Sequence, residues 1–296
     1  MARKSKRRKF GSTSRGVGWW SSLAPHRRRQ LLAGCATTAI LATLAVSGGV
    51  ALARLDTHVS HALMRQATPV LSFVDLPTHL TGLAEDDMVR CAEGLLEGDW
   101  MRSDLCELLA GRVSEVGWVA AVNFVRRSGT GRFEISCQYR TPIAMVQKND
   151  EFYLVDRHSV RLPGRYHYDA IWLLIQGVGQ SAPDPGRVWP GGDVRAGLAV
   201  IEAIVGRSFV SQVTAVLVDN LAGRRDRHRS HIELATDRAG GRIRWGSAPG
   251  FELEENSVAE KLAILTENYR QTGRADAGHP VIDISLYPDR FTIPAE

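Results

Sequence analysis

The first 55 residues contain neither aspartate nor glutamate, and the first carboxylate side chain belongs to Asp56. Residues 1–30 hold ten lysines and arginines, whereas residues 31–53 carry no charged side chain at all. A helix rising about 1.5 Å per residue would extend about 34 Å over that uncharged stretch, enough to cross the hydrocarbon core of a bilayer. The lack of charge therefore predicts a transmembrane helix from Leu31 to Ala53.

The basic residues lie on one side of this stretch, which predicts that residues 1–30 form a cytoplasmic tail and that everything after the helix is exported. The expected location is the cell inner membrane, with a single pass and the C-terminal part outside. Two export patterns overlap the helix. Arg27–Leu32 resembles a twin-arginine signal, and Leu32–Cys35 imitates a lipobox, but no apolar stretch precedes it, so lipidation at Cys35 is not expected. Cleavage after Ala53 would release a soluble protein, but the long basic leader and the full spanning length favour retention.

The predicted exported part has no excess of basic over acidic residues. The whole chain has 37 Lys and Arg against 32 Asp and Glu. Without the ten basic residues of the tail, 27 remain against 32, so the exported part is acidic. This balance argues against a nucleic-acid partner, and the tail itself is best explained as a topology signal that contacts anionic lipid.

Cysteine is scarce, with four in the chain. Cys35 falls in the predicted membrane helix, which leaves an odd set of Cys91, Cys106 and Cys137 outside. An odd set predicts no disulfide framework, and small buried thiols are the default interpretation. A bridge between Cys91 and Cys106 remains an alternative.

No pattern that requires catalysis is present. The sequence lacks a G-x-S-x-G elbow, a P-loop, H-E-x-x-H, paired C-x-x-C and S-x-x-K. His228 and His231 fall in a predicted strand, where odd spacing would send them to opposite faces. We therefore expect no enzyme, no metal, no cofactor and no small-molecule substrate. The basic cluster at 224–229 is predicted to be a solvated hairpin tip.

Periodicity predicts an α+β module directly after a spacer at 54–68. Residues 69–74 are expected to form a strand. Two amphipathic helices should follow, the second with Ser103 as N-cap and Leu105, Leu108 and Leu109 on its apolar face. Alternation then predicts two strands, one with Trp118, Ala120, Val122 and Phe124 on a face and one with Phe133, Ile135, Cys137 and Tyr139. The expected order is β-α-α-β-β.

The second half predicts a mixed α/β domain. Asp193 is a candidate N-cap for a helix whose apolar face is Val194, Leu198, Ile201 and Val205. Strands are expected around 213–217, 232–234 and 243–245. Ser257 and Glu260 have capping-box spacing, and the helix they open should end near Gly273. The last predicted strand is Val281–Leu286, with Ile282, Ile284 and Leu286 on one face.

Several segments resemble motifs of one family, in the same order. Residues 118–126 (WVAAVNFVR) resemble a W-[IV]-x-x-[VA]-x-V-x-R strand, and 141–144 (TPIA) resemble an E-x-x-P-x-A segment in which Gln138 or Tyr139 stands where Glu is usual. Residues 152–163 resemble a Y-x-[LV]-[VI]-D-x-x-G-x-x-[LF] pair, except that Ser159 replaces the turn Gly. Residues 172–178 resemble an L-P-x-[IL]-x-G entry, and 234–246 an L-x-[TL]-x-x-G-x-x-[VI]-x-[LW]-G hairpin. Together these resemble the FtsQ/DivIB family of bacterial cell division proteins.

This resemblance implies a POTRA domain at 69–141, a β-domain at 142–290 and a C-terminal tail at 291–296. It implies a non-catalytic scaffold at the division septum that links early and late division proteins. In that family the last strand of the β-domain receives a segment of FtsB, itself paired with FtsL, and the complex acts on FtsW and FtsI. The last strand is thus expected to lie at an open edge of its sheet. The implied partner-binding residues are Val281, Asp283, Ser285 and Tyr287 of that edge, with Lys261 and Tyr269 nearby. The alternatives are a POTRA-type translocation or chaperone adaptor and, less favoured, a membrane-tethered hydrolase.

Overall fold

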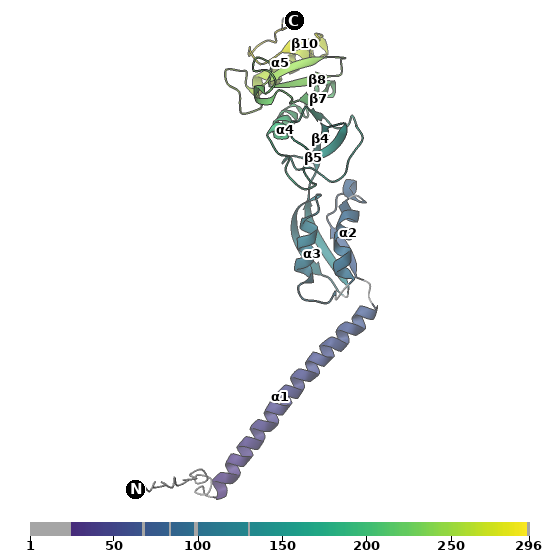
Figure 1. Cartoon of the computed structure of the whole chain (residues 1–296), viewed down its shortest axis with the longest axis vertical. Coiled ribbons are helices and arrows are strands. Elements are labelled where there is room, and N and C mark those ends of the chain that lie inside the picture. Colours follow the sequence, from purple (N-terminus) through teal and green to yellow (C-terminus); the bar gives the residue numbers. More distant parts are fainter. Residues whose placement is uncertain (1–24, 67–68, 83, 98–99, 130, 295–296) are drawn as a thin grey trace, which may run out of the picture. The chain divides into compact units, whose positions relative to one another are not determined.

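The computed structural model describes residues 25–66, 69–82, 84–97, 100–129 and 131–294 (Figure 1). The chain divides into two compact units, Met1–Gln66 and Ala67–Glu296, and each is described by itself. The predicted basic tail lies almost wholly outside the described residues. Among those residues the fold is mixed α+β, with five α-helices and two mixed sheets.

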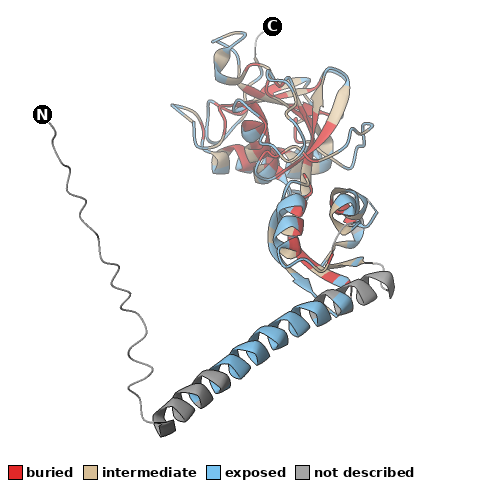
Figure 2. Ribbon diagram, turned by 60° about the horizontal axis from the view of Figure 1, so that its bottom comes forward, coloured by how far each residue is buried: buried red, intermediate tan, exposed pale blue. Residues whose placement is uncertain are grey.

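The first unit is one long helix, α1 (Pro25–Gln66). Its segment Thr37–Leu55 is long and apolar enough to cross a membrane, and none of it is buried by the rest of the chain (Figure 2). The hydroxyls of Thr43 and Ser47 donate to carbonyls three or four residues earlier, so these polar groups are satisfied inside the helix. The helix continues to Gln66, so most of the predicted spacer is helical.

The second unit begins with a three-stranded sheet covered by two helices. The elements run β1 (Val70–Val74), α2 (Ala84–Leu96), α3 (Leu105–Ser114), β2 (Val119–Arg127) and β3 (Arg132–Tyr139). Strand β3 lies in the middle, parallel to β1 and antiparallel to β2. The predicted β-α-α-β-β order is confirmed, and Phe133, Ile135 and Cys137 of β3 are buried as their alternation predicted.

Two local predictions in this module were wrong. Residue 104, not Ser103, is the N-cap of α3, and its carboxylate binds the Arg102 guanidinium at 2.6 Å rather than a helix N–H. Strand β2 does not keep strict alternation, because its pairing with β3 shifts register between 119 and 121 and again between 122 and 124. Each such irregularity moves later side chains to the other face, so Phe124 is exposed and Val125 is half-buried.

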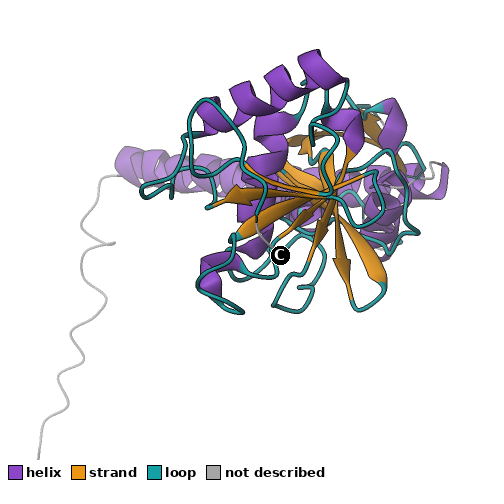
Figure 3. Ribbon diagram, turned by 90° about the horizontal axis from the view of Figure 1, so that it is seen from above, coloured by secondary structure: helices purple, strands orange, loops and turns teal. Residues whose placement is uncertain are grey.

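The chain enters the second sheet after only two residues, because β3 ends at Tyr139 and β4 begins at Pro142. The seven strands are ordered β10-β9-β8-β7-β6-β4-β5. Their bounds are β4 (Pro142–Lys148), β5 (Glu151–Asp156), β6 (Leu174–Gln176), β7 (Val213–Leu217), β8 (Ile232–Thr236), β9 (Arg242–Gly246) and β10 (Val281–Asp283). Figure 3 shows the strands splayed like a fan, as a twisted sheet requires.

Helices α4 (Asp193–Ile204) and α5 (Val258–Thr272) pack on one face of this sheet. Alternate strand residues divide between two hydrophobic clusters: Val146, Ile175 and Val216 join the helices, whereas their neighbours Met145, Leu174 and Ala215 join a cluster that includes Trp118 and Ile135 of the first module. This period of two is the ordinary property of a strand buried on both faces. Both sheets therefore contribute to a common core.

The helix predictions were right in kind and wrong in detail. The capping box of Ser257 and Glu260 is present, and Gly273 closes α5 in the left-handed conformation at φ 71°. In α4, however, Gly192 is the N-cap and Asp193 is the first helical residue. Val205 ends the helix with an exposed side chain, because the chain turns outward at that point instead of completing the apolar face.

The three cysteines of the second unit are free thiols, so Cys91 and Cys106 are not bridged. Cys137 is buried in the first module, and that burial raises the pKa of its thiol to about 11. A thiol with such a pKa is almost entirely protonated at neutral pH and is a poor nucleophile. Cys137 is therefore a small core residue.

Candidate functional site

The outermost strand of the second sheet is β10, which pairs with β9 in parallel. The carbonyl of Pro280 accepts from the Arg242 N–H at 2.8 Å, and the Ile284 N–H donates to the Arg244 carbonyl at 3.2 Å. Because backbone groups alternate in direction along a strand, Val281 and Asp283 direct theirs away from the sheet. These two residues therefore form the outer edge, as predicted.

The strand is shorter than predicted and ends at Asp283 rather than Leu286. The Asp283 carboxylate accepts hydrogen bonds from the Ser285 N–H at 2.9 Å and from the Ser285 hydroxyl at 2.6 Å. Such a side-chain-to-backbone contact turns the chain two residues later and breaks the ladder. As a result Leu286 is 58% exposed instead of lying on the core face beside Ile284.

The segment that follows β10 is held by one residue, Asn256. Its side-chain amide donates to the carbonyls of Ile284 at 2.7 Å and Tyr287 at 2.5 Å, and its N–H donates to the Ser285 carbonyl at 2.7 Å. Ser285 is therefore buried and engaged, so it does not extend the outer edge. Tyr287 is 44% exposed and keeps an accessible ring.

Lys261 and Tyr269, predicted near the partner-binding edge, lie mainly in the core. Lys261 is completely buried, with Nζ 3.1 Å from Glu255 and over the Trp245 ring. The Glu255 carboxylate also accepts from the N–H and hydroxyl of Ser247, so the buried charge has a hydrogen-bonded counterion. Tyr269 is half-buried against the main hydrophobic cluster. Lys261 thus has no surface to offer a partner.

The outer edge is not bare at Asp283, contrary to prediction. Its N–H donates to the Thr292 carbonyl at 2.7 Å, and the Thr292 N–H donates back to the Asp283 carbonyl at 2.8 Å. This is an isolated antiparallel bridge made by the C-terminal segment of the same chain. Position 281 carries the remaining outward-directed backbone groups of β10.

The opposite edge of the sheet is covered. The chain after β5 turns back along it, and the N–H groups of Leu162 and Tyr166 donate to the carbonyls of Leu154 and Phe152 at 2.9 Å each. Covering an edge in this way blocks pairing with other chains. Within the described residues of this sheet, β10 is therefore the edge that offers strand addition.

The turn that starts this cover is built on buried Asp156. One carboxylate oxygen accepts from the N–H groups of His158 and Val160, and the other from Arg140 at 2.7 Å. Ser159, which stands where the motif that this segment resembles has glycine, adopts φ 61° with its side chain buried. That conformation is one that glycine takes most readily, so the expected turn is made without its preferred residue.

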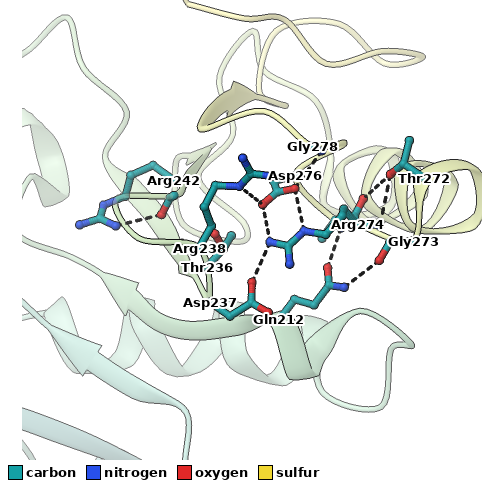
Figure 4. A network of polar contacts seen from close by, with 12 residues as sticks. Gln212, Thr236, Asp237, Arg238, Arg242, Thr272, Gly273, Arg274, Asp276 and Gly278 are labelled. Carbon is teal, nitrogen blue, oxygen red and sulfur yellow. Dashed lines mark hydrogen bonds and ion pairs between the residues drawn. The ribbon is translucent and has the colours of Figure 1, made fainter.

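A polar junction fixes the chain between α5 and β10 (Figure 4). Arg274 binds Asp237 at 2.7 Å and fully buried Asp276 at 2.6 Å, and Gln212 donates to the Gly273 carbonyl and accepts from the Ala275 N–H, both at 2.8 Å. Burial alone raises the pKa of Asp276, but Arg274, the Gly278 N–H and Arg238 together hold it below its ordinary value. The junction positions the start of β10 on the sheet.

The prediction that residues 224–229 form a solvated basic hairpin tip is wrong for Arg224. The Arg224 guanidinium binds Asp193 at 2.8 Å and donates to the carbonyls of Gly177, Val218 and Asp219. It is a structural latch between the start of α4 and the end of β7. His228 and His231 precede β8 rather than lying in a strand, because Asn220 folds this connection onto itself through several backbone contacts.

Other features offer less chemistry. An open cleft of about 690 Å³ is lined by Tyr139, Arg140, Asp156 and His158, but its Arg140–Asp156 pair is committed to the turn described above. In the part of the chain that the structure describes, no group of three His, Cys, Asp or Glu side chains could hold a metal ion. Sequence reasoning missed the exposed Phe251 and Leu253 on the loop before Asn256, although two large apolar residues in a Gly-, Pro- and Glu-rich stretch were a readable signal.

Neither the models of known protein families nor the curated proteins give a match to this chain.

Proposed function

We propose that this chain is a non-catalytic, single-pass membrane scaffold of the FtsQ/DivIB type, which binds an extended segment of another protein at the outer edge of β10. The observation that carries the proposal is an edge strand with outward-directed backbone groups at one end of a sheet whose other end is covered. Strand addition uses such groups for affinity and alternate side chains for specificity.

Two further features support it. The order β1-α2-α3-β2-β3 agrees with the POTRA module that the sequence motifs imply. Helix α1 has the length and composition of a membrane span, and its basic flank would keep the N-terminus in the cytoplasm. The proposed partners are division proteins of the FtsB and FtsL type and, through them, FtsW and FtsI at the septum.

The proposed binding surface comprises backbone groups and exposed side chains at the end of β10. Backbone groups of Val281 and Asp283 form the edge, and Tyr287 and Leu286 supply exposed apolar surface beside it. Phe251 and Leu253 are also exposed, on the loop that leads to Asn256, whose side chain holds residues 284–287. Exposed apolar side chains that are grouped mark interaction sites, and the neighbours Leu286 and Tyr287 form such a group directly after β10.

The test is site-specific photocross-linking of the full chain in dividing bacteria. A photoreactive residue in place of Tyr287 is expected to trap one polypeptide, identified by mass spectrometry, whereas the same residue in place of exposed Ile171 is expected to trap none. Val281→Pro, which removes an outward N–H without touching the pairing with β9, should abolish the cross-link. An unchanged cross-link in Val281→Pro would reject this edge as the site.

A fluorescent fusion to the cytoplasmic N-terminus separates the division role from the alternatives. Enrichment at midcell during constriction is expected. A uniform distribution around the envelope would contradict a role at the septum and would favour the translocation or chaperone adaptor.

A further inference from the structure

The C-terminal segment of the chain already occupies the edge at which we place the partner. Asp283 and Thr292 exchange both of their backbone hydrogen bonds, which is the narrow pair of an antiparallel ladder. Phe291 and Thr292 thus lie against β10 where the added strand of another protein would begin.

Few contacts hold residues 291–292 against β10. Phe291 is half-buried against the main hydrophobic cluster, and its ring lies 5.6 Å from that of His279. Residues 286–290, which lead to it, are exposed, and within them the Arg290 guanidinium lies 4.9 Å from the Tyr287 ring. Ile293, directly after Thr292, is 58% exposed. One aromatic side chain and one pair of backbone bonds therefore fasten the segment.

We infer that residues 291–292 are an intramolecular placeholder, which leaves when an extended segment of a partner pairs with β10. The inference rests on the function proposed above and adds the regulation of the same edge. A covalently attached segment competes at an effective concentration in the millimolar range, so it excludes weak and accidental strands while yielding to one that makes a longer ladder.

A partner segment must replace the backbone hydrogen bonds that Thr292 makes to Asp283. It must run antiparallel to β10 and restore both bonds to Asp283, and it gains the outward groups of Val281, to which the placeholder makes no bridge. Each backbone hydrogen bond contributes modestly in water, so loss of the placeholder should raise apparent partner affinity on the order of tenfold.

The first experiment follows amide hydrogen exchange at Asp283 in the full chain in detergent micelles, with the Ile284 N–H, which bonds to β9, as internal reference. Three variants are compared: a chain ending at Arg290, Thr292→Pro, and the matched control Thr292→Ala, which keeps the backbone N–H. Truncation and Thr292→Pro should speed exchange at Asp283 on the order of tenfold relative to Ile284, and Thr292→Ala should leave it unchanged. Equal exchange in all four proteins would overturn the inference.

The second experiment adds a synthetic peptide of residues 288–296 at millimolar concentration. It should restore slow exchange at Asp283 in the truncated chain, and the same peptide with proline in place of Thr292 should not. If truncation speeds exchange but the peptide restores nothing, the edge does not accept a strand in trans and the inference fails. This assay needs no cellular partner, so its failure is distinct from a failure of the Tyr287 cross-link.

The cross-linking assay then tests exchange with the partner itself. Truncation and Thr292→Pro should increase the yield of the Tyr287 cross-link. A decrease would show that the segment belongs to the binding surface and is not a competitor, which would overturn the inference.

Discussion

Ser159 shows at the scale of one residue how the fold tolerates an unfavourable choice. Its φ of 61° places an L-amino acid with a Cβ in the left-handed region, in a turn fixed on all sides by Asp156. Non-glycine residues pay about 1–2 kcal/mol for that conformation. The residue at position 159 must adopt this conformation because the turn that leads the chain back over β5 requires a positive φ there.

Glycine at this position should therefore be stabilising. Ser159→Gly is expected to raise the free energy of unfolding by about 0.5–1 kcal/mol, after allowance for the greater freedom of glycine in the unfolded chain. Ser159→Val should lower it by about 2 kcal/mol, because a β-branched residue fits this conformation worst. Urea denaturation of the full chain in detergent measures both, and equal stability of the three proteins would contradict the assigned strain.

Lys261 is the second residue whose environment makes a sharp prediction. Its stem fills space beside Trp245, and its ammonium serves Glu255, whose carboxylate also accepts from Ser247. Lys261→Met keeps the volume, and Glu255 is not stranded, because its side chain is 21% exposed and keeps its bonds to Ser247. The free energy of unfolding should therefore change by less than about 1.5 kcal/mol. Lys261→Ala leaves a cavity and should cost about 2–4 kcal/mol. Equal losses in denaturant titrations of both variants would show that the charge, not the volume, matters.

The contrast between Ser257 and Lys261 explains what could be predicted about residues. The capping box joins positions three apart and needs no information from elsewhere in the chain, so its spacing alone was sufficient. The burial of Lys261 depends on Glu255 and Trp245, which reach it only in the folded structure. Local hydrogen bonding is readable from sequence, whereas a charge compensated by tertiary contacts is not.

At the scale of elements, the junction of Figure 4 decides how well β10 is placed. It connects the end of α5 to β7 and β8 through Arg274, Asp276 and Gln212. Breaking a buried ion pair by removing one partner leaves an uncompensated group, so the loss is large even when the intact pair contributes little.

Asp276→Asn is expected to lower the free energy of unfolding by about 2–3 kcal/mol at pH 7, with Asp237→Asn as a milder control because Asp237 is more exposed. The folded-state pKa of Asp276 lies below its unfolded value, so its contribution is complete above the unfolded pKa and is lost as the pH falls through the folded one. The difference between wild type and Asp276→Asn should therefore shrink below about pH 4. A difference that is constant with pH in urea titrations would contradict this assignment.

Elements with a clear period were predicted well, and their ends were not. Strand β3 and helix α5 lie where alternation and capping placed them. Strand β10 is shorter than its apolar alternation suggested, because the Asp283 side chain turns the chain. Strand β2 lost its alternation to register irregularities against β3, which depend on the partner strand and leave no mark in its own sequence.

At the scale of the whole molecule, α1 makes the most direct prediction. The full chain should remain in the membrane pellet after alkaline carbonate extraction. Replacing Leu44 and Val46 together by arginine should release it, because each charge near the centre of a span costs about 2.5–3.5 kcal/mol on insertion. The matched control replaces both residues by isoleucine and should stay in the pellet. Extraction of the wild-type chain would show that α1 does not span the bilayer.

The position of the candidate site could be predicted from the sequence, but the pairing of the C-terminal segment with it could not. The last strand was expected at an edge, and it lies there. That residues near its own C-terminus return to pair with Asp283 was not foreseen. Phe291, Thr292 and Ile293 alternate, but a run of three residues is too short to predict a strand, and the pairing depends on how residues 284–291 turn the chain back. Backbone pairing across such an irregular turn is decided by the folded structure.

The unequal ends of the seven-stranded sheet set the stoichiometry that this sheet permits. One end is covered by the chain after β5, so in the part of this sheet that the structure describes an added strand would join at β10. A sheet with one free edge can bind one added strand. It therefore forms a closed complex, whereas head-to-tail contacts between copies build filaments. Through this surface each copy should take up a single ligand chain, and its complexes should have a fixed one-to-one composition however abundant the ligand becomes.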